Sequence, residues 1–212
     1  MLQYLSYMEK RARKNKYDSR SEIMVLFVNA CARKGSRTRR LANRLLTKLG
    51  TDIQEIGLTG TEFPKTDEAF LAKRDKFIQS RDFGDRIFDM ARDFASADIV
   101  VVAAPFWDLS FPAALKQYFE HINVVGLTFA YSDDGRPIGL CKAKKLYYVT
   151  TAGGKIYNDE YGFGYVKALA QNFYGIDDVQ LIKAEGLDIF GADTEKILKS
   201  AEDHIDRICE NE

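Results

Sequence analysis

Residues 30–38 combine hydroxyl and cationic side chains in a pattern suited to binding phosphate. The polar side chains of this segment are Arg33, Lys34, Ser36, Arg37 and Thr38. A helical pattern follows, and a helix N-terminus offers unpaired backbone N–H groups and a partial positive charge. The segment holds one glycine, so it is neither a P-loop nor a glycine-rich dinucleotide fingerprint. The alternative interpretation is that Ser36 only caps the helix.

Residues 104–112 place aromatic side chains between two prolines, directly after the most apolar stretch of the chain. Phe106 and Trp107 form a surface against which a planar ring system can pack. The alternative is that Phe106, Trp107 and Phe111 simply cover the hydrophobic core.

Residues 150–157 contain the adjacent glycines Gly153 and Gly154. Adjacent glycines let the backbone approach a ligand closely and present N–H groups to it. An ordinary strand-to-helix turn would account for one glycine more easily than for two. Together, a phosphate-type loop, an aromatic surface and a donor-rich glycine loop suit flavin mononucleotide (FMN) better than ATP or NAD.

These three segments follow three predicted strands of an α/β protein. We expect strands over 23–28, 52–58, 98–104, 145–151 and within 179–187, with a short extended piece at 128–131 and a turn at 133–135. We expect helices near 36–49, 68–79, 83–95, 111–122, 161–173 and 194–209. Such alternation predicts right-handed crossovers and a three-layer domain with a parallel sheet between helices. Ligands of open α/β sheets bind outside the carboxyl ends of the strands, so we expect the three loops at one edge.

Composition narrows the class of protein. The chain has 212 residues, with 31 Lys and Arg against 31 Asp and Glu. A net charge of zero argues against binding of nucleic acid or of an anionic membrane, since both require a positive excess. The longest uncharged apolar run covers nine residues, 99–107, against about 20 for a membrane span. Three scattered cysteines and two histidines predict a reducing, cytoplasmic location and no metal site. His121 is interpreted as structural, and Cys31 as a small apolar filler.

Residues 1–21 form a basic N-terminal extension, and residues 22–212 are expected to form one domain. Apolar residues precede the basic ones, which is the reverse of a secretory signal. The extension is interpreted as a solvated amphipathic arm or short helix. An arm around a partner subunit and an organelle-targeting peptide are the alternatives, although Glu9 and Asp18 weaken the second of these.

From about residue 23 onward, the sequence resembles the flavodoxin-like NAD(P)H dehydrogenase (quinone) family, and within it the FMN-dependent NADH azoreductases. The motifs that carry the resemblance are 104–116, 126–131 with Gly139 and Leu140, 151–154, and the 36–38 loop. The resemblance implies a flavodoxin-like fold with a five-stranded parallel sheet in the order 2-1-3-4-5. It also implies a homodimer with one non-covalent FMN per subunit, near the dimer interface.

The resemblance further implies roles for individual residues. The residues implied for binding the FMN phosphate are Ser36, Arg37 and Thr38, and those implied for contacting the ring and ribityl chain are Pro105, Phe106, Trp107, Asp108 and Leu109. The polar edge of the ring would contact Thr151, Ala152, Gly153 and Gly154. The substrate pocket would include Phe129, Tyr131 and Tyr157. Two positions depart from the better-known azoreductases, which commonly have Asn at the position of Asp108 and Arg at that of Ala152. No side chain is expected to act as a catalytic nucleophile, because the flavin carries the hydride.

The resulting prediction is an FMN-dependent NAD(P)H oxidoreductase that reduces quinones or azo compounds by two electrons with ping-pong kinetics. The sequence does not choose between NADH and NADPH, and it does not identify the small-molecule electron acceptor. The alternatives are a flavodoxin-type electron carrier, although such carriers are usually strongly acidic, and a flavin-binding protein without turnover.

Overall fold

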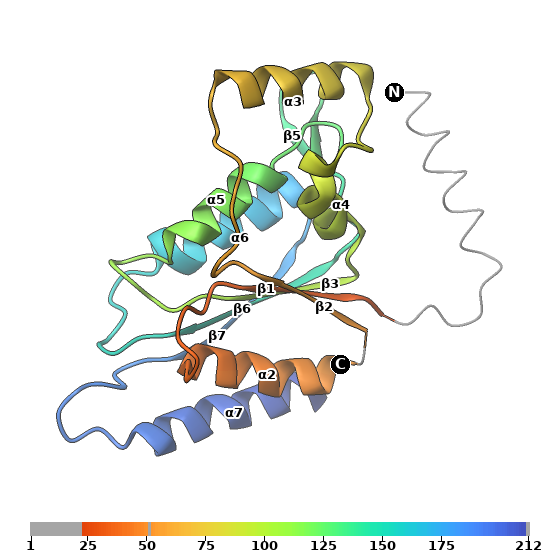
Figure 1. Cartoon of the computed structure of the whole chain (residues 1–212). Helices are drawn as coiled ribbons and strands as arrows, with labels where there is room; N and C mark the ends of the chain where they lie inside the picture. Colours follow the sequence, from red (N-terminus) through yellow and green to blue (C-terminus); the bar gives the residue numbers. More distant parts are fainter. Residues whose placement is uncertain (1–22, 51, 211–212) are drawn as a thin grey trace.

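The computed structural model describes residues 23–50 and 52–210. Five parallel strands form one sheet in the order β2-β1-β3-β6-β7, and Figure 1 shows this sheet between two layers of helices. The strands are β1 (Val25–Asn29), β2 (Ile53–Gly57), β3 (Ile99–Ala103), β6 (Lys145–Thr151) and β7 (Asp178–Ala184). Among the five main strands this is the predicted order 2-1-3-4-5. The extension predicted over 1–21 lies outside the described residues.

Helices cover both faces of the sheet. Figure 1 shows α2 and α7 below it and α4, α5 and α6 above it, with α3 farther from the strands. The helices are α2 (Arg37–Leu49), α3 (Glu68–Ser80), α4 (Asp89–Ser96), α5 (Ala113–Ile122), α6 (Tyr165–Leu169) and α7 (Thr194–Glu210). No helix in the described ranges combines the length and the apolar character needed to cross a membrane.

The alternation of side chains along the central strands supplies both cores. In β1, Leu26 and Val28 pack into the core under α4, α5 and α6, whereas Val25 and Phe27 pack into the core over α2 and α7. β3 divides its side chains between the two cores in the same way. Successive residues of a strand point to opposite faces. The continuous apolar runs of β1 and β3 therefore serve both layers, as expected for a doubly covered parallel sheet.

The helix predicted over 83–95 begins later than expected. A single 3-10 turn, η2 (Arg86–Phe88), precedes α4. Asp85 caps this turn by accepting a hydrogen bond from the Ile87 N–H, 3.0 Å away. The Arg92 guanidinium donates to the carbonyl oxygens of Phe83 and Asp85. These contacts satisfy backbone groups outside a helix, so the chain stays irregular until Asp89.

The helix predicted over 161–173 occupies the expected place with a different internal geometry. Two π-helical turns, η3 (Glu160–Gly164) and η4 (Ala170–Tyr174), flank the short α6. Gly162 of η3 packs beside the Phe106 ring, where an added Cβ would lie 3.7 Å from the ring. The wide turn thus lies directly against the aromatic loop that follows β3.

The extended piece predicted at 128–131 is one strand of a hairpin. β4 (Phe129–Tyr131) pairs antiparallel with β5 (Pro137–Gly139), which we did not predict. Gly139 approaches the end of η4 so closely that a Cβ there would lie 2.1 Å from the Gly175 nitrogen. This close approach, possible only for glycine, fixes the hairpin against the helical layer.

Candidate functional site

The first wall of the site is the N-terminus of α2. Ser36 is the N-cap, and its hydroxyl accepts a hydrogen bond from the Arg39 N–H at 3.2 Å. The capping role considered as an alternative for Ser36 is therefore present. It leaves the first turn of α2 open, because no acceptor is assigned to the backbone N–H of Arg37 or Thr38 in the described part of the chain. These are the groups that bind an anion at a helix N-terminus.

A buried hydrogen bond joins this wall to the glycine loop. The hydroxyls of Thr38 and Thr151 lie 2.6 Å apart, and both side chains are buried. Thr38 lies in the first turn of α2 and Thr151 at the carboxyl end of β6. The bond fixes the spacing between two loops that are 113 residues apart in sequence.

The second wall is the aromatic loop after β3. The Phe106 N–H donates to the Thr151 carbonyl at 3.0 Å, which ties this loop to the end of β6. Trp107 and Ser110 exchange backbone hydrogen bonds of 3.0 and 2.7 Å around a tight turn. Asp108 and Leu109 at its tip have φ angles of 49° and 67°. Two consecutive left-handed residues without glycine are uncommon, and such strain clusters at functional sites.

The third wall is the glycine loop after β6. The Ala152 N–H already donates to the Ala184 carbonyl at 2.9 Å. In contrast, no acceptor is assigned within the described residues to the N–H groups of Gly153 and Gly154. Those two glycines therefore supply the available donors of the loop.

A fourth wall, which the sequence analysis missed, comes from the loop after β7. The Asp188 N–H donates to the Gly153 carbonyl at 2.9 Å, and the Asp188 carboxylate forms an ion pair of 2.8 Å with Arg37. A Cβ added at Gly153 would lie 2.4 Å from Asp188 Oδ2. The rule that placed the other three loops applies to this one as well, since it follows the carboxyl end of a parallel strand.

Together these walls enclose a hollow of about 200 Å³ at the carboxyl edge of the sheet. Its lining residues are Ala32, Arg33, Gly35, Ser36, Arg37, Thr38, Pro105, Phe106, Trp107, Thr151, Ala152, Gly153, Leu187 and Asp188. The three segments singled out in the sequence thus meet at one place. Six other residues assigned to the site by resemblance lie outside this lining: Asp108, Leu109, Gly154, Phe129, Tyr131 and Tyr157.

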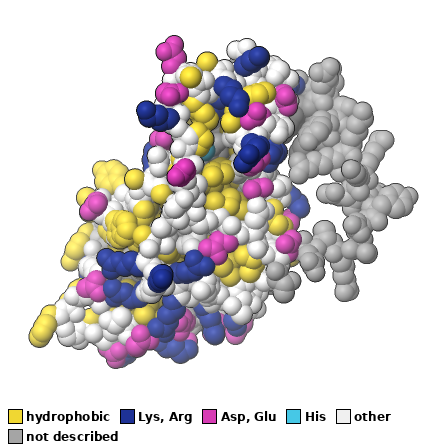
Figure 2. Space-filling view, viewed as in Figure 1, with side chains coloured by type: hydrophobic (Ala, Val, Ile, Leu, Met, Phe, Trp, Pro, Cys, Tyr) yellow, Lys and Arg dark blue, Asp and Glu magenta, His cyan; other side chains and the backbone are white. Residues whose placement is uncertain are grey.

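The six residues outside the lining differ in exposure. Phe129 of β4 is buried, whereas Tyr131 is 54% exposed and Tyr157 is 95% exposed. On the face in Figure 2, Lys and Arg side chains gather next to a group of hydrophobic side chains.

Cys31 and His121 have the structural environments expected for them. Burial raises the pKa of the Cys31 thiol, and the Ser36 hydroxyl and the Arg39 charge offset this only in part. His121 stacks on Phe63 with ring centroids 5.3 Å apart, and Phe70 packs edge-on against it. Burial, with a further contribution from the Arg74 charge, lowers the His121 pKa. Neither side chain lines the hollow.

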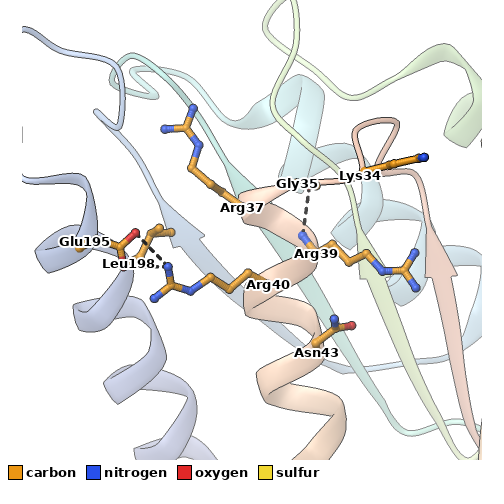
Figure 3. A pocket seen from close by; sticks show the side chains of 9 residues that line it. Lys34, Gly35, Arg37, Arg39, Arg40, Asn43, Glu195 and Leu198 are labelled. Carbon is orange, nitrogen blue, oxygen red and sulfur yellow. Dashed lines mark hydrogen bonds and ion pairs between the residues drawn. The ribbon is translucent and has the colours of Figure 1, made fainter.

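A second hollow lies on the outer side of α2. Figure 3 shows Arg40 directed toward Glu195 of α7, whereas Arg37 and Arg39 leave the helix in other directions. Arg40 pairs with Glu195 and Glu202, both at 2.8 Å, and Arg39 pairs with Glu55 at 2.9 Å. Carboxylates on neighbouring elements thus neutralise both Arg39 and Arg40. We interpret this second hollow as a surface groove lined by the ion pairs that connect α2 to α7 and β2.

A doubly covered parallel sheet in the order 2-1-3-4-5, with an open helix N-terminus at its carboxyl edge, is the arrangement of a flavodoxin-like α/β protein. The model of the family described as having a flavodoxin-like fold matches residues 24–208. The chain belongs to this family.

Named relatives extend the comparison. An FMN-dependent NADH:quinone oxidoreductase of Coprothermobacter proteolyticus is 34% identical over 84% of this chain and 93% of its own length. FMN-dependent NADH:quinone oxidoreductase 2 of Clostridium acetobutylicum is 35% identical over 85% of this chain and 94% of its own.

Solved structures agree on the fold. An azoreductase from Bacillus anthracis superimposes with a TM-score of 0.75 at 22% identity, covering 89% of this chain and 99% of that one. An FMN-dependent NADH-azoreductase from the same species, determined in complex with FMN, gives a TM-score of 0.74 at 24% identity, covering 89% and 98%.

Proposed function

We propose that this protein is an FMN-dependent NAD(P)H oxidoreductase that reduces quinones, azo compounds or both by two electrons. The observation that carries the proposal is the convergence of Ser36, Trp107 and Gly153 on one hollow beside the open N-terminus of α2. The names of the two oxidoreductase relatives support FMN as cofactor and NADH as donor.

The donor set of the hollow fits FMN. The free N–H groups of the first turn of α2, with the Ser36 hydroxyl and the Arg37 guanidinium, suit its phosphate. Phe106 and Trp107 offer an apolar surface for its ring, and Trp107 is 39% exposed, so part of its indole is available for contact. The Gly153 N–H group suits the polar edge of the ring, and that of Gly154 follows it in the chain just outside the lining of the hollow. Pro105, Asp108 and Leu109 shape the turn that carries Trp107.

When bound, FMN supplies the group that accepts hydride from NAD(P)H and passes electrons to the acceptor. The protein's own contribution is binding, orientation and electrostatics. Backbone N–H groups at the glycine loop would stabilise negative charge at the ring edge, as donors of an oxyanion hole do. The aromatic loop excludes water from one side of the ring. Donor and acceptor enter the same pocket in turn, which gives ping-pong kinetics.

We also propose a homodimer, with the substrate pocket formed near Phe129, Tyr131 and Tyr157. The support is that two loops that line the hollow also carry exposed large apolar side chains, and exposed apolar surface marks interaction sites. Phe190, in the loop that carries Asp188, is fully exposed, and Tyr157 nearly so. Sedimentation velocity tests the dimer: a species of twice the chain mass supports it, and a monomer at micromolar concentration contradicts it.

Anaerobic reduction tests the activity. The purified protein, loaded with FMN, is mixed with NADH and separately with NADPH, and the flavin absorbance band is followed. We expect bleaching by at least one donor and recovery of the band on addition of a quinone. Steady NAD(P)H oxidation with the quinone excludes a single-electron carrier. Bound FMN that neither donor reduces would support a flavin-binding protein without turnover.

The net charge of zero fits an enzyme better than an electron carrier of the flavodoxin type, which is usually strongly acidic.

We propose a cytoplasmic location, supported by three cysteines of which two, Cys31 and Cys141, are buried thiols. Cell fractionation with an antibody against the protein tests this location.

A further inference from the structure

The loop after β7 places a carboxylate in a hollow that is otherwise built for an anion. Asp188 Oδ1 lies 2.8 Å from Arg37 Nη2, and the Leu187 carbonyl accepts a second, longer bond from Arg37 Nη1 at 3.4 Å. The other oxygen, Oδ2, fills the space over Gly153 where a side chain would otherwise project. The carboxylate therefore bridges the proposed phosphate end and the proposed ring-edge donors.

We propose that Asp188 competes with the cofactor phosphate for Arg37 and thereby sets how strongly the site prefers FMN to unphosphorylated riboflavin. This inference rests on the proposed function. The residue belongs to no motif on which that proposal depends.

The exposure of the pair makes such competition feasible. The Asp188 side chain is 64% exposed and that of Arg37 is 33% exposed. Ion pairs of this kind contribute little to stability, typically about 0–1 kcal/mol. A phosphate carries more negative charge than a carboxylate and accepts paired hydrogen bonds from arginine. It can therefore displace Asp188 from Arg37, but each binding event must break the pair or hold two anions close together.

Arg39 and Arg40, on the same helix, cannot readily take the place of Arg37. Neither side chain belongs to the lining of this hollow, since Arg39 pairs with Glu55 and Arg40 with Glu195. Arg37 and Arg33 are the arginines of this segment that line the hollow. Neutralising Asp188 should therefore release a substantial share of the positive charge directed at the ligand.

The test compares two ligands that differ by one phosphate. Dissociation constants of FMN and riboflavin are measured by quenching of flavin fluorescence for the full chain and for Asp188→Asn. Asparagine keeps the size of the side chain and the backbone N–H bond to Gly153, and it removes the charge. We expect FMN to bind about three- to tenfold more tightly to the variant, and the affinity for riboflavin to change less than twofold. Asp188→Ala, which removes the carboxylate entirely, should shift the two ligands in the same way.

The matched control is Glu195→Gln. It removes one negative charge from a carboxylate that pairs with an arginine of the same helix, Arg40, and neither residue lines the hollow. We expect its affinities for both flavins to equal those of the wild type. In an Arg37→Ala background, Asp188→Asn should no longer improve FMN binding, because the contested guanidinium is absent.

The outcomes separate the two proposals. If the wild type binds FMN and Asp188→Asn binds it equally or more weakly, Asp188 does not compete with phosphate and the inference is wrong. An equal gain for FMN and riboflavin also contradicts it, because a general change in the loop would act on both ligands. If the wild type binds neither flavin, the proposed function itself fails, and this inference fails with it.

Discussion

The two ends of the hollow are built differently. At the phosphate end, Thr38 and Thr151 are buried and joined by a hydrogen bond, and Arg37 is held by Asp188. At the ring end, Trp107 is 39% exposed and Leu109 is 59% exposed. One end is a fixed polar site that a single chain completes. The other is an apolar surface that needs a ligand or a second subunit to cover it.

This contrast indicates which interactions set the geometry and which provide affinity. Hydrogen bonds and ion pairs between loops fix the distance from α2 to the glycine loop before any ligand binds. The aromatic loop contributes apolar contact area for the ring. The shape of its turn depends on two consecutive residues with left-handed backbone angles, Asp108 and Leu109. Substitution of Trp107 at the ring end should therefore act mainly on flavin affinity, and substitution of the buried threonines at the phosphate end mainly on stability.

The largest effect is expected at the ring end. Trp107→Ala removes the aromatic surface, and loss of aromatic stacking costs about 1–3 kcal/mol, so FMN should bind about 5- to 150-fold more weakly. The free energy of unfolding should change little, since the side chain is partly exposed. Trp107→Phe serves as the control and should retain most of the affinity. Unchanged FMN affinity in the alanine variant would remove Trp107 from the site.

The next effect is expected at the phosphate end. Thr38→Val leaves the buried Thr151 hydroxyl without its partner and should lower the free energy of unfolding by about 1–3 kcal/mol. Urea denaturation measures this change. Thr38→Val combined with Thr151→Val removes both hydroxyls and should recover much of the loss, because two apolar groups need no partner. If the double variant is less stable than the single one, the hydrogen bond is not the cause.

The rate of thiol modification tests whether the loop formed by residues 30–38 keeps Cys31 away from solvent. Burial raises the pKa of the Cys31 thiol, so less of it is thiolate at pH 8 than in an exposed cysteine, and the thiolate is the reactive form. We expect iodoacetamide to modify Cys31 more slowly than the less buried Cys209, with the rate still rising above pH 9. Cys141, whose pKa burial raises to about 12, should react more slowly again. Mass spectrometry of peptides gives the three modification rates. Rapid modification of Cys31 at pH 7 would mean that solvent reaches this thiol and would contradict the burial of the loop.

The smallest effect is expected at Leu109. A left-handed residue other than glycine costs about 1–2 kcal/mol, and glycine loses about 0.5–1 kcal/mol through its greater entropy in the unfolded chain. Leu109→Gly should therefore raise the free energy of unfolding by at most about 1.5 kcal/mol. Leu109→Ala, which keeps the strain, should show no gain. A clear loss of stability in the glycine variant would mean that the exposed leucine is held by packing.

The sequence predicted the sheet well because each of its central strands is a continuous apolar run. In β1, four consecutive apolar side chains need burial: Val25, Leu26, Phe27 and Val28. A sheet covered by helices on both faces buries all four. The loops after β1, β3 and β6 were found because each carries an unusual residue type at a strand end: hydroxyls and arginines, paired aromatics, or adjacent glycines.

The sequence could not predict contacts that depend on how distant loops meet. Asp188 is an ordinary carboxylate in a polar loop, and only the folded chain brings it to Arg37, 151 residues away. The irregular stretch before α4 depends on Arg92 reaching back to two carbonyls, which overrides the helical pattern. β5 was missed because its three residues, which include proline and glycine, carry little strand preference of their own.

The protein contains one tryptophan, Trp107, so its emission reports on the aromatic loop alone. The most direct test of FMN binding in the hollow is therefore titration of the wild-type chain with FMN while the tryptophan emission is recorded. The account predicts saturable quenching that ends at one FMN per chain. Emission that stays unchanged, or that falls only in proportion to absorbed light through a large excess of FMN, would contradict it.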